Sequence, residues 1–318
     1  MHTTPLQALE GTRVLSLALN LPGPAALQRC RAMGAQCHKL EPLAPAGQRS
    51  ADPMALYSPQ AYDALHAGIT IVQADLKSPE GQARLHQELA DTDVLLTSFR
   101  PSALTKLGLD AATLHARYPR LCLVRIVGAS GVHAEEAGHD LTYLAQSGLV
   151  TSTELPATLY ADMGGSLMAS EAVLQALLAR ARSGQGADLE VALADAAHWL
   201  ALPRHWELTT PQADIGGAHA GYRIYPCADG LVALAALEPH FARRLWQAAG
   251  LPADTDARAA HTQQAIAAFV QVQSCAALQA LAQARDIPLH TLPAAPQPRG
   301  LERVHDLARR GAGCESGW

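Results

Sequence analysis

The sequence is poor in aromatic side chains and has no excess of basic residues. Its 318 residues include 24 Lys and Arg against 29 Asp and Glu, a formal net charge of −5, and only 4% of them are aromatic. Proteins that bind nucleic acids or anionic membrane surfaces through their overall charge carry an excess of basic residues. We therefore expect neither a nucleic acid nor a membrane as a partner.

Long apolar runs and closely spaced cysteines are also missing. No stretch of about 18 apolar residues occurs, and the N-terminus lacks a basic segment followed by an apolar one. The 6 cysteines are scattered without a Cys-x-x-Cys pair, and the 14 histidines show no His-Glu-x-x-His spacing. We expect a soluble, cytoplasmic protein without a metal site, whose cysteines are reduced and serve mostly in packing.

What the sequence does have is a series of short apolar runs separated by helical stretches. Hydrophobic residues make up 49% of the chain, and its length suggests about two domains. Continuous apolar runs alternating with amphipathic helices are typical of a parallel sheet that is covered on both faces. This pattern predicts a large α/β domain over residues 1–210. The runs occupy residues 13–19, 37–40, 69–72, 94–97 and 121–127.

The pattern changes after residue 210. Asp229-Gly230 separates two apolar runs, residues 222–225 and 231–235, and this arrangement is a strong signal for a β-hairpin. Alanine-rich helical segments follow. We expect a smaller α+β domain over residues 211–290, and then a proline-rich linker and a short C-terminal segment over residues 291–318.

Nucleotide-binding loops are not found where an α/β chain would carry them. The first apolar run leads into Leu21-Pro22-Gly23-Pro24, which lacks the three glycines of a dinucleotide fingerprint, and no phosphate-binding Gly-x-x-x-x-Gly-Lys motif occurs. NAD and ATP are therefore poor candidates for a cofactor.

Two polar boxes could carry chemistry instead. His139 and Asp140 follow a glycine, and Asp162 precedes the pair Gly164-Gly165 at the start of a long helical stretch. Both aspartates could simply cap helices, with His139 as a loop residue. However, glycine destabilises a helix, and here it would let a ligand approach the first-turn amides, which stabilise anions. Glu238 is a third candidate, and a helix start at Pro239 explains it equally well.

Several short motifs occur in an order and spacing that identify a family. On these motifs the chain resembles the family III coenzyme A transferases (CaiB/BaiF), and within them it is most similar to the α-methylacyl-CoA racemases. The resemblance covers roughly residues 9–290. The motifs are Leu9–Leu15, Pro22–Pro24, Lys39–Pro42, Ala74–Lys77, Asp93–Leu96, Phe99–Pro101, Leu107–Leu109, Gly138–Asp140, Asp162–Gly165, Gly184–Gly186 and Tyr222 through Asp229-Gly230 to Pro239.

The resemblance implies a fold and a set of partners. It implies a Rossmann-like domain that binds coenzyme A, a smaller hairpin-containing domain, and two chains interlocked as a homodimer. The substrate would be an acyl-CoA, so that coenzyme A enters as part of the substrate and no cofactor is tightly bound.

The resemblance also assigns roles to individual residues. Asp162 matches the residue that transferases use as nucleophile and racemases use as one of two acid–base groups. His139 matches the second acid–base group of the racemases, and Glu238 matches a carboxylate beside the site. The residues expected to bind coenzyme A are Lys39 and Arg100, through its phosphates, together with Asp140, Tyr143, Gly164 and Gly165.

The chemistry favours one of the two reactions. Inverting a stereocentre next to a thioester needs one group to remove the α-proton and another to return a proton to the opposite face. His139 and Asp162 supply such a pair, whereas a transferase needs only the carboxylate. We therefore expect racemisation of a 2-methylacyl-CoA, with coenzyme A transfer through Asp162 as the alternative.

Three departures from the family pattern support a further alternative. Residues 66–73 lack the usual arginines, residues 128–134 differ from the usual glycine-rich loop, and the chain stops at Trp318. Fewer charge-assisted phosphate contacts would weaken coenzyme A binding. A diverged protein that binds an acyl-CoA with little catalysis is therefore the third possibility.

Overall fold

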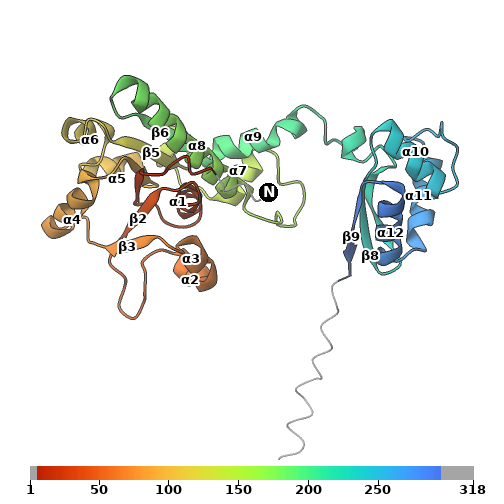
Figure 1. Cartoon of the computed structure of the whole chain (residues 1–318), viewed down its shortest axis with the longest axis horizontal. Helices are drawn as coiled ribbons and strands as arrows, with labels where there is room; N and C mark the ends of the chain where they lie inside the picture. Colours follow the sequence, from red (N-terminus) through yellow and green to blue (C-terminus); the bar gives the residue numbers. More distant parts are fainter. Residues whose placement is uncertain (1–5, 295–318) are drawn as a thin grey trace, which may run out of the picture. The chain divides into compact units, whose positions relative to one another are not determined.

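The chain forms two compact units. In the computed structural model, which describes residues 6–294, the first unit ends at Leu202 and the second begins at Pro203 (Figure 1). The boundary expected at residue 210 lies slightly beyond this division. Each unit has a sheet and a hydrophobic core of its own.

A parallel sheet forms the centre of the first unit. Its six strands run in the order β3-β2-β1-β4-β5-β6, and every neighbouring pair is parallel. This confirms the expected α/β class and the five expected strands. The strands are β1 (Arg13–Ser16), β2 (Gln36–Glu41), β3 (Thr70–Gln73), β4 (Val94–Thr97), β5 (Cys122–Val127) and β6 (Asp188–Ala192).

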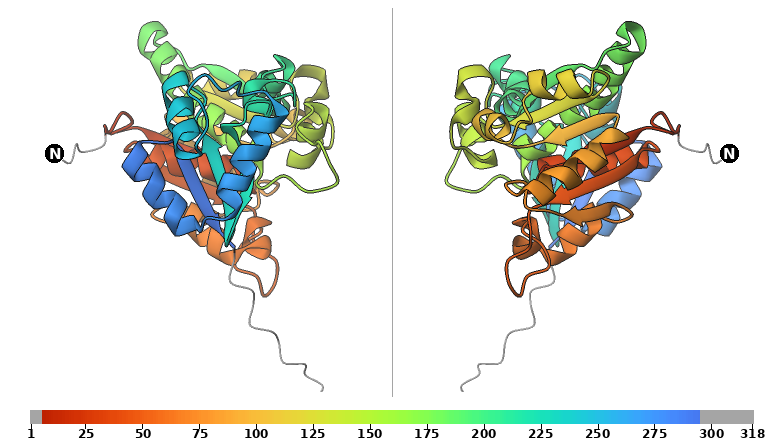
Figure 2. Two further views of the ribbon diagram at one scale, coloured as in Figure 1. Left: turned by 90° about the vertical axis from the view of Figure 1, so that its right-hand side faces the viewer. Right: turned by 90° about the vertical axis from the view of Figure 1, so that its left-hand side faces the viewer.

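Helices cover both faces of this sheet (Figures 1 and 2). Five of the helices in the described part of the chain begin with proline, whose fixed φ suits the first helical position. The first unit contains α1 (Pro22–Ala32), α2 (Met54–Tyr57), α3 (Pro59–Leu65), α4 (Pro79–Ala90), α5 (Pro101–Lys106), α6 (Ala111–Arg117), the 3₁₀ helix η1 (Gly131–Glu135), α7 (Asp140–Gln146) and α8 (Tyr160–Ser183), while α9 (Leu193–His205) crosses the division between the units.

The apolar strands supply two separate cores because successive side chains point to opposite faces. Along β4, for example, Leu96 packs in a core with α1, α7 and α8, whereas its neighbour Leu95 packs in a core with α4, α5 and α6. Near-continuous apolar strands are thus explained by burial on both sides.

Strand β6 was not expected from the sequence, because it does not form an apolar run. Its residues alternate between polar and apolar. The guanidinium of Arg125 on β5 pairs with Asp188 at 2.9 Å and with Glu190 at 2.8 Å. The exposed face of this edge is therefore held by charges and the other face by Leu189 and Val191.

The second unit contains an antiparallel sheet packed against helices. Its elements are the 3₁₀ helix η2 (Asp214–Gly216), β7 (Tyr222–Cys227), β8 (Gly230–Ala235), α10 (Pro239–Ala248), α11 (Ala260–Gln271), α12 (Cys275–Arg285) and β9 (Leu289–Pro293). The expected hairpin is confirmed, because Cys227 pairs with Gly230 across the turn.

The third strand of this sheet corrects one expectation. Residues 291–293 were expected to open a linker, but they belong to β9, which pairs antiparallel with β8. Backbone hydrogen bonding to β8 and packing of Leu289 against the core explain why this segment is ordered. The rest of the expected linker and C-terminal segment lies outside the described residues.

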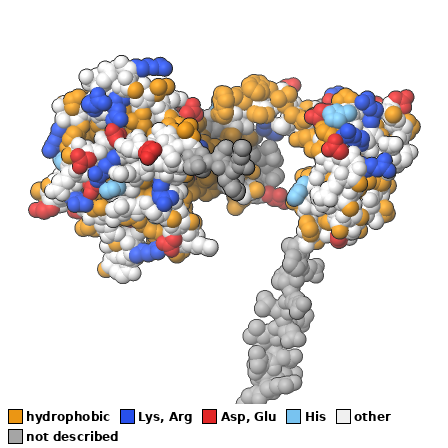
Figure 3. Space-filling model, in the orientation of Figure 1, with side chains coloured by type: hydrophobic (Ala, Val, Ile, Leu, Met, Phe, Trp, Pro, Cys, Tyr) orange, Lys and Arg blue, Asp and Glu red, His pale blue; other side chains and the backbone are white. Residues whose placement is uncertain are grey.

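Surface charge and helix hydropathy bear on the partners expected from the sequence. On the face drawn in Figure 3, basic side chains of the first unit are interspersed with acidic ones. Between residues 6 and 294, no single helix is long and apolar enough to cross a membrane, and only the bent pair α11 and α12 reaches that length and composition when the two are joined.

Candidate active site

A cavity of about 530 Å³ lies beyond the carboxyl ends of β1, β4 and β5. Its wall includes residues 19–22, which follow β1, residues 98–100, which follow β4, and residues 126–128, which close β5. The strand order reverses between β1 and β4, and open α/β sheets bind ligands at such a switch point. Five of the predicted site residues line this cavity, namely Arg100, His139, Asp140, Tyr143 and Asp162.

His139 is the N-cap residue of α7, and its side chain is exposed. Its backbone N–H donates to Oγ1 of Thr142 at 3.0 Å, and that hydroxyl donates back to the carbonyl of His139 at 2.7 Å. The interpretation of Asp140 as the cap of its own helix was therefore wrong. These two bonds involve only the backbone of His139 and fix it at the start of α7. The imidazole makes no capping hydrogen bond.

The carboxylate of Asp140 instead caps α8. Asp140 is buried, and its Oδ1 accepts the N–H of Ala161 at 2.7 Å and the N–H of Asp162 at 3.1 Å. Two otherwise unpaired first-turn amides are thus bonded, and a negative charge lies at the positive end of the helix. This contact joins the start of α7 to the start of α8, and thereby places His139 and Asp162 in one cavity.

Asp162 has an unusual protonation equilibrium. Burial, and then the charge of Asp140, raise the pKa of the Asp162 carboxyl from 3.8 to about 6, while His139 acts in the opposite direction. At neutral pH the group is mostly a carboxylate, and it is a stronger base than an exposed aspartate. A pKa close to the working pH suits a group that must both accept and donate a proton.

The glycine pair does not have the predicted role. A Cβ on Gly165 would lie 2.2 Å from Cδ2 of Leu193, and one on Gly164 would lie 3.2 Å from Cδ1 of Leu200. Both glycines therefore allow α8 to approach α9 closely. The first-turn amides that a ligand was expected to reach are those that Asp140 bonds.

Tyr143 is buried beside Asp162, and its hydroxyl end lies between two glycines of the cavity wall. A Cβ on Gly128 or Gly138 would lie 2.2 or 2.4 Å from that hydroxyl oxygen. Burial, and then the charge of Asp162, raise the pKa of Tyr143, so it remains a neutral hydrogen-bond donor. Gly128 and Gly138 thus leave room for a phenol at the cavity.

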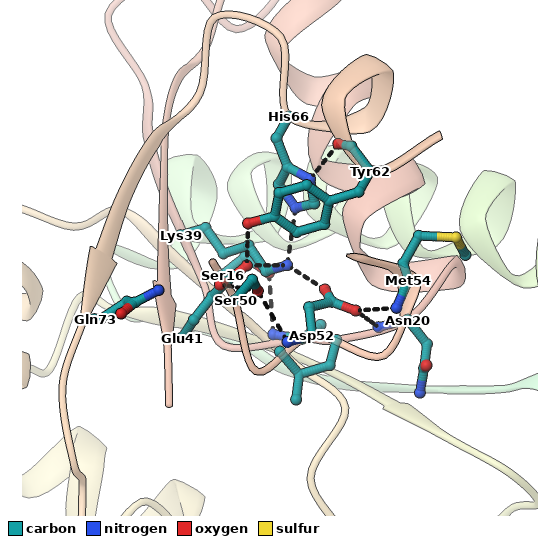
Figure 4. A network of polar contacts seen from close by, with 12 residues as sticks. Ser16, Asn20, Lys39, Glu41, Ser50, Asp52, Met54, Tyr62, His66 and Gln73 are labelled. Carbon is teal, nitrogen blue, oxygen red and sulfur yellow. Dashed lines mark hydrogen bonds and ion pairs between the residues drawn. The ribbon is translucent and has the colours of Figure 1, made fainter. Parts of the chain in front are cut away.

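Lys39 has a different place from the one predicted. It is fully buried, and its ammonium donates to Asp52 at 2.5 Å, Glu41 at 2.9 Å and His66 at 2.8 Å (Figure 4). These three bonds use all the protons of the ammonium. Lys39 is therefore unavailable to a coenzyme A phosphate, which corrects the expected role.

The network around Lys39 includes a residue of the segment that lacks arginines, and it contacts the cavity wall. His66, in the segment that lacks arginines, has its pKa lowered by burial and by Lys39, and so its ring stays neutral and accepts a hydrogen bond from the ammonium. Asp52 also accepts the N–H groups of Asn20 and Met54, both at 3.0 Å (Figure 4). Asn20 and Met54 line the cavity, and Asn20 has a φ of 64°. The buried charges therefore hold two segments of the cavity wall.

The remaining predicted residues lie on the surface. Arg100 is exposed at the N-cap of α5, and its role as a phosphate ligand stays a prediction. Glu238 is exposed at the N-cap of α10 in the second unit, and its role likewise stays a prediction. A second cavity of about 340 Å³ shares Phe99 with the first and is also lined by Lys77, which the site prediction missed. The motif Ala74–Lys77 was the signal that could have found it.

Comparison with known proteins identifies the family. Residues 9–297 match the sequence pattern of CoA-transferase family III. The chain belongs to CoA-transferase family III. The predicted family is thus confirmed, and the chain is an acyl-CoA-processing member of it.

Family III relatives of this chain include enzymes of both reaction types. It is 31% identical over 272 residues to a succinate–glutarate CoA-transferase of Agrobacterium fabrum. The aligned region covers 78% of this chain and 68% of the relative. It is also 31% identical over 267 residues to the α-methylacyl-CoA racemase of Homo sapiens, covering 78% of this chain and 66% of that enzyme. The chain thus spans about two thirds of the length of these curated relatives.

Solved structures agree on the family III fold. The protein Rv3272 of Mycobacterium tuberculosis superimposes with a TM-score of 0.74 at 22% identity, covering 96% of this chain and 88% of that one. A CaiB/BaiF family protein from Brucella suis gives a TM-score of 0.69 at 24% identity, covering 93% and 85%.

The Asp140 cap leads to a test of the charge at Asp162. Asp140→Asn keeps an oxygen that can accept the amides of α8 but removes a negative charge, so we expect the pKa of Asp162 to fall below about 6. Carbon NMR of the Asp162 carboxyl during a pH titration measures this, with Asp162→Asn used to assign the signal. An unchanged midpoint in the Asp140 variant would contradict the assigned cause.

The buried ammonium leads to a test of stability. Lys39→Met leaves Glu41 and Asp52 buried without their counter-ion, and we expect it to lower the free energy of unfolding by about 3–5 kcal/mol. Arg49→Met is the control, because it breaks an exposed pair with Asp63 and should cost less than about 1 kcal/mol. Urea denaturation followed by circular dichroism compares them, and equal losses would argue against a structural role for Lys39.

The glycine contacts predict opposite effects for neighbouring substitutions. Gly165→Ala should lower the free energy of unfolding by about 1–3 kcal/mol, because the new methyl overlaps Leu193. Gly164→Ala should be neutral or stabilising, because its contacts are milder and alanine favours the helix by up to about 1 kcal/mol. Thermal unfolding distinguishes them. If both variants instead kept wild-type stability and lost ligand binding, the original interpretation would be restored.

Proposed function

We propose that this family III protein racemises a 2-methylacyl-CoA by removing and returning the proton next to the thioester. The observation that carries the proposal is that an imidazole, His139, and a carboxylate with a raised pKa, Asp162, line the same cavity. Inversion of the stereocentre requires two acid–base groups, whereas coenzyme A transfer requires only the carboxylate.

The proposed reaction consists of two proton transfers. Asp162 or His139, whichever faces the α-hydrogen of the bound enantiomer, takes that proton, and the C–H electron pair becomes the enolate of the thioester. The other group then gives a proton to the opposite face and restores the carbonyl. The neutral phenol of Tyr143 can donate a hydrogen bond to the enolate oxygen, where negative charge develops.

The surroundings of the cavity support a long ligand with a charged end. Phe99 lines both cavities. Arg100 lines the first cavity, and Lys77 lines the second. This arrangement suits a thioester held in the larger cavity and a phosphate-bearing coenzyme A that extends outward. The homodimer and the role of Glu238 beside the reacting carbon are parts of the same proposal, and they rest on family membership.

Coenzyme A transfer is the second candidate, because Asp162 could equally attack an acyl-CoA and form an anhydride. The similarity to the succinate–glutarate enzyme favours it. In that reaction His139 has no proton to move. The two functions therefore differ in the residue they need besides Asp162.

The deciding experiment incubates each enantiomer of a 2-methylacyl-CoA with the protein in heavy water. We expect deuterium at the α-carbon together with loss of optical purity. For the enantiomer whose α-proton Asp162 removes, the rate should fall below about pH 6 as Asp162 becomes protonated. His139→Ala should slow racemisation by roughly 10²–10⁴-fold, since it removes one acid–base group. Asp162→Ala should abolish it.

The control is His261→Ala, which removes an exposed histidine of α11 and should leave the rate unchanged. Chiral chromatography and mass spectrometry report the two events separately. Transfer of coenzyme A to added succinate without deuterium uptake would replace racemisation by the second candidate. Binding of acyl-CoA by calorimetry with neither reaction would leave a binding protein.

A further inference from the structure

Two cysteines meet at the turn of the β7–β8 hairpin. Cys227 is the last residue of β7, and Cys275 is the first residue of α12. Their sulfur atoms are 3.5 Å apart, although 48 positions separate them in the chain. Both residues belong to the second unit, so this contact is independent of the cavity and of the proposed function.

Hydrogen bonds hold the two backbone segments in place. Oδ1 of Asp229, in the turn, accepts the N–H of Cys275 at 2.6 Å and lies 3.8 Å from the sulfur of Cys227. The N–H of Ala228 donates to the carbonyl of Gln273 at 2.8 Å. The turn is therefore fixed against the start of α12, and the two thiols stay together without a covalent link.

A metal ion explains the cluster less well than a bond between the sulfurs. Cys227, Asp229 and Cys275 offer three metal-type donors, one short of a closed tetrahedral site. Oδ1 of Asp229 already accepts a hydrogen bond from the N–H of Cys275, so one of the three donor atoms is engaged.

We propose that Cys227 and Cys275 form a reversible disulfide when the protein meets a small disulfide oxidant such as oxidised glutathione. A disulfide needs a sulfur–sulfur distance of about 2.05 Å, so the sulfurs must approach by about 1.5 Å. Side-chain rotation can supply such a movement, because the backbone segments are already adjacent.

The exchange proceeds in two balanced steps. Cys227 is half-buried and Cys275 is buried, so the thiolate of Cys227 attacks the oxidant first. One glutathione thiolate leaves, and Cys227 carries the other as a mixed disulfide. Cys275 then loses its proton to solvent and attacks the sulfur of Cys227, which releases the second glutathione. Overall two protein thiols are oxidised, and one glutathione disulfide is reduced to two thiols.

The bond would close a loop within the second unit. Strand β8 and helices α10 and α11 lie between the two cysteines. A crosslink across them restricts the unfolded chain more than the folded one, so oxidation should raise the melting temperature. Reduction should reverse the change.

The test uses the full chain with Cys314→Ser, so that this cysteine outside the described residues cannot react. The protein is incubated with oxidised or reduced glutathione in the presence of a chelator, without denaturant. We expect the oxidised sample to lose two hydrogen atoms in mass, to give a linked Cys227–Cys275 peptide, and to melt at a higher temperature. Cys227→Ser and Cys275→Ser should each prevent the link.

Cys122→Ser is the matched control, because Cys122 is a buried core residue and its loss should leave the link intact. Circular dichroism of the reduced variants checks that each one folds. Glutathione retained on Cys227 without a link, or a link that forms only in urea, would overturn the proposal. A disulfide between two chains through Cys227 would overturn it as well.

Discussion

The arrangement of the candidate site depends on one buried carboxylate at the junction of two helices. Asp140 is the first residue of α7, but its carboxylate accepts hydrogen bonds from two amides in the first turn of α8. His139 directly precedes Asp140 in the chain, and one of the amides that Asp140 bonds is that of Asp162. This one contact therefore positions the backbone of both reactive residues. The same contact leaves a negative charge beside Asp162, which is one reason for the raised pKa of that carboxyl. The Asp140 contact thus contributes both to the position of Asp162 and to the basicity of its carboxylate.

The sheet provides the frame on which this junction acts. Reversal of strand order between β1 and β4 opens a gap at their carboxyl ends, and the segments that follow each strand form its walls. One wall includes Asn20 in a left-handed conformation, bonded by Asp52. Asp52 is in turn paired with the buried ammonium of Lys39. Breaking such a pair on one side leaves an uncompensated buried charge, so loss of this wall contact would be costly to the fold.

The sequence predicted the fold well and the local roles of site residues less well. Five strands of the large sheet were recognised from their apolar runs, whereas β6 alternates between polar and apolar residues and β9 contains a histidine, a threonine and a proline, so neither gives such a signal. His139 and Asp162 line one cavity, and before the structure only the family resemblance paired them. The capping role of Asp140 could not be foreseen, since it joins residues 21 and 22 positions apart through tertiary structure. Lys39 was misjudged for the same reason, because its partners Asp52 and His66 come from separate segments.

The geometry also explains why one family can contain two reactions. A carboxylate with a raised pKa at a capped helix start can act as a nucleophile toward a thioester carbonyl or as a base toward the neighbouring C–H, and nothing in its own surroundings decides between them. The proposed racemisation needs a second group, and the N-cap residue of α7, His139, lines the same cavity. Its backbone is bonded to Thr142 and its ring is exposed, so the imidazole suits delivery of a proton to a carbanion, a step that acyl transfer does not require. Replacing this side chain should leave the Asp140 junction intact, because that junction uses the carboxylate of Asp140 and the amides of α8.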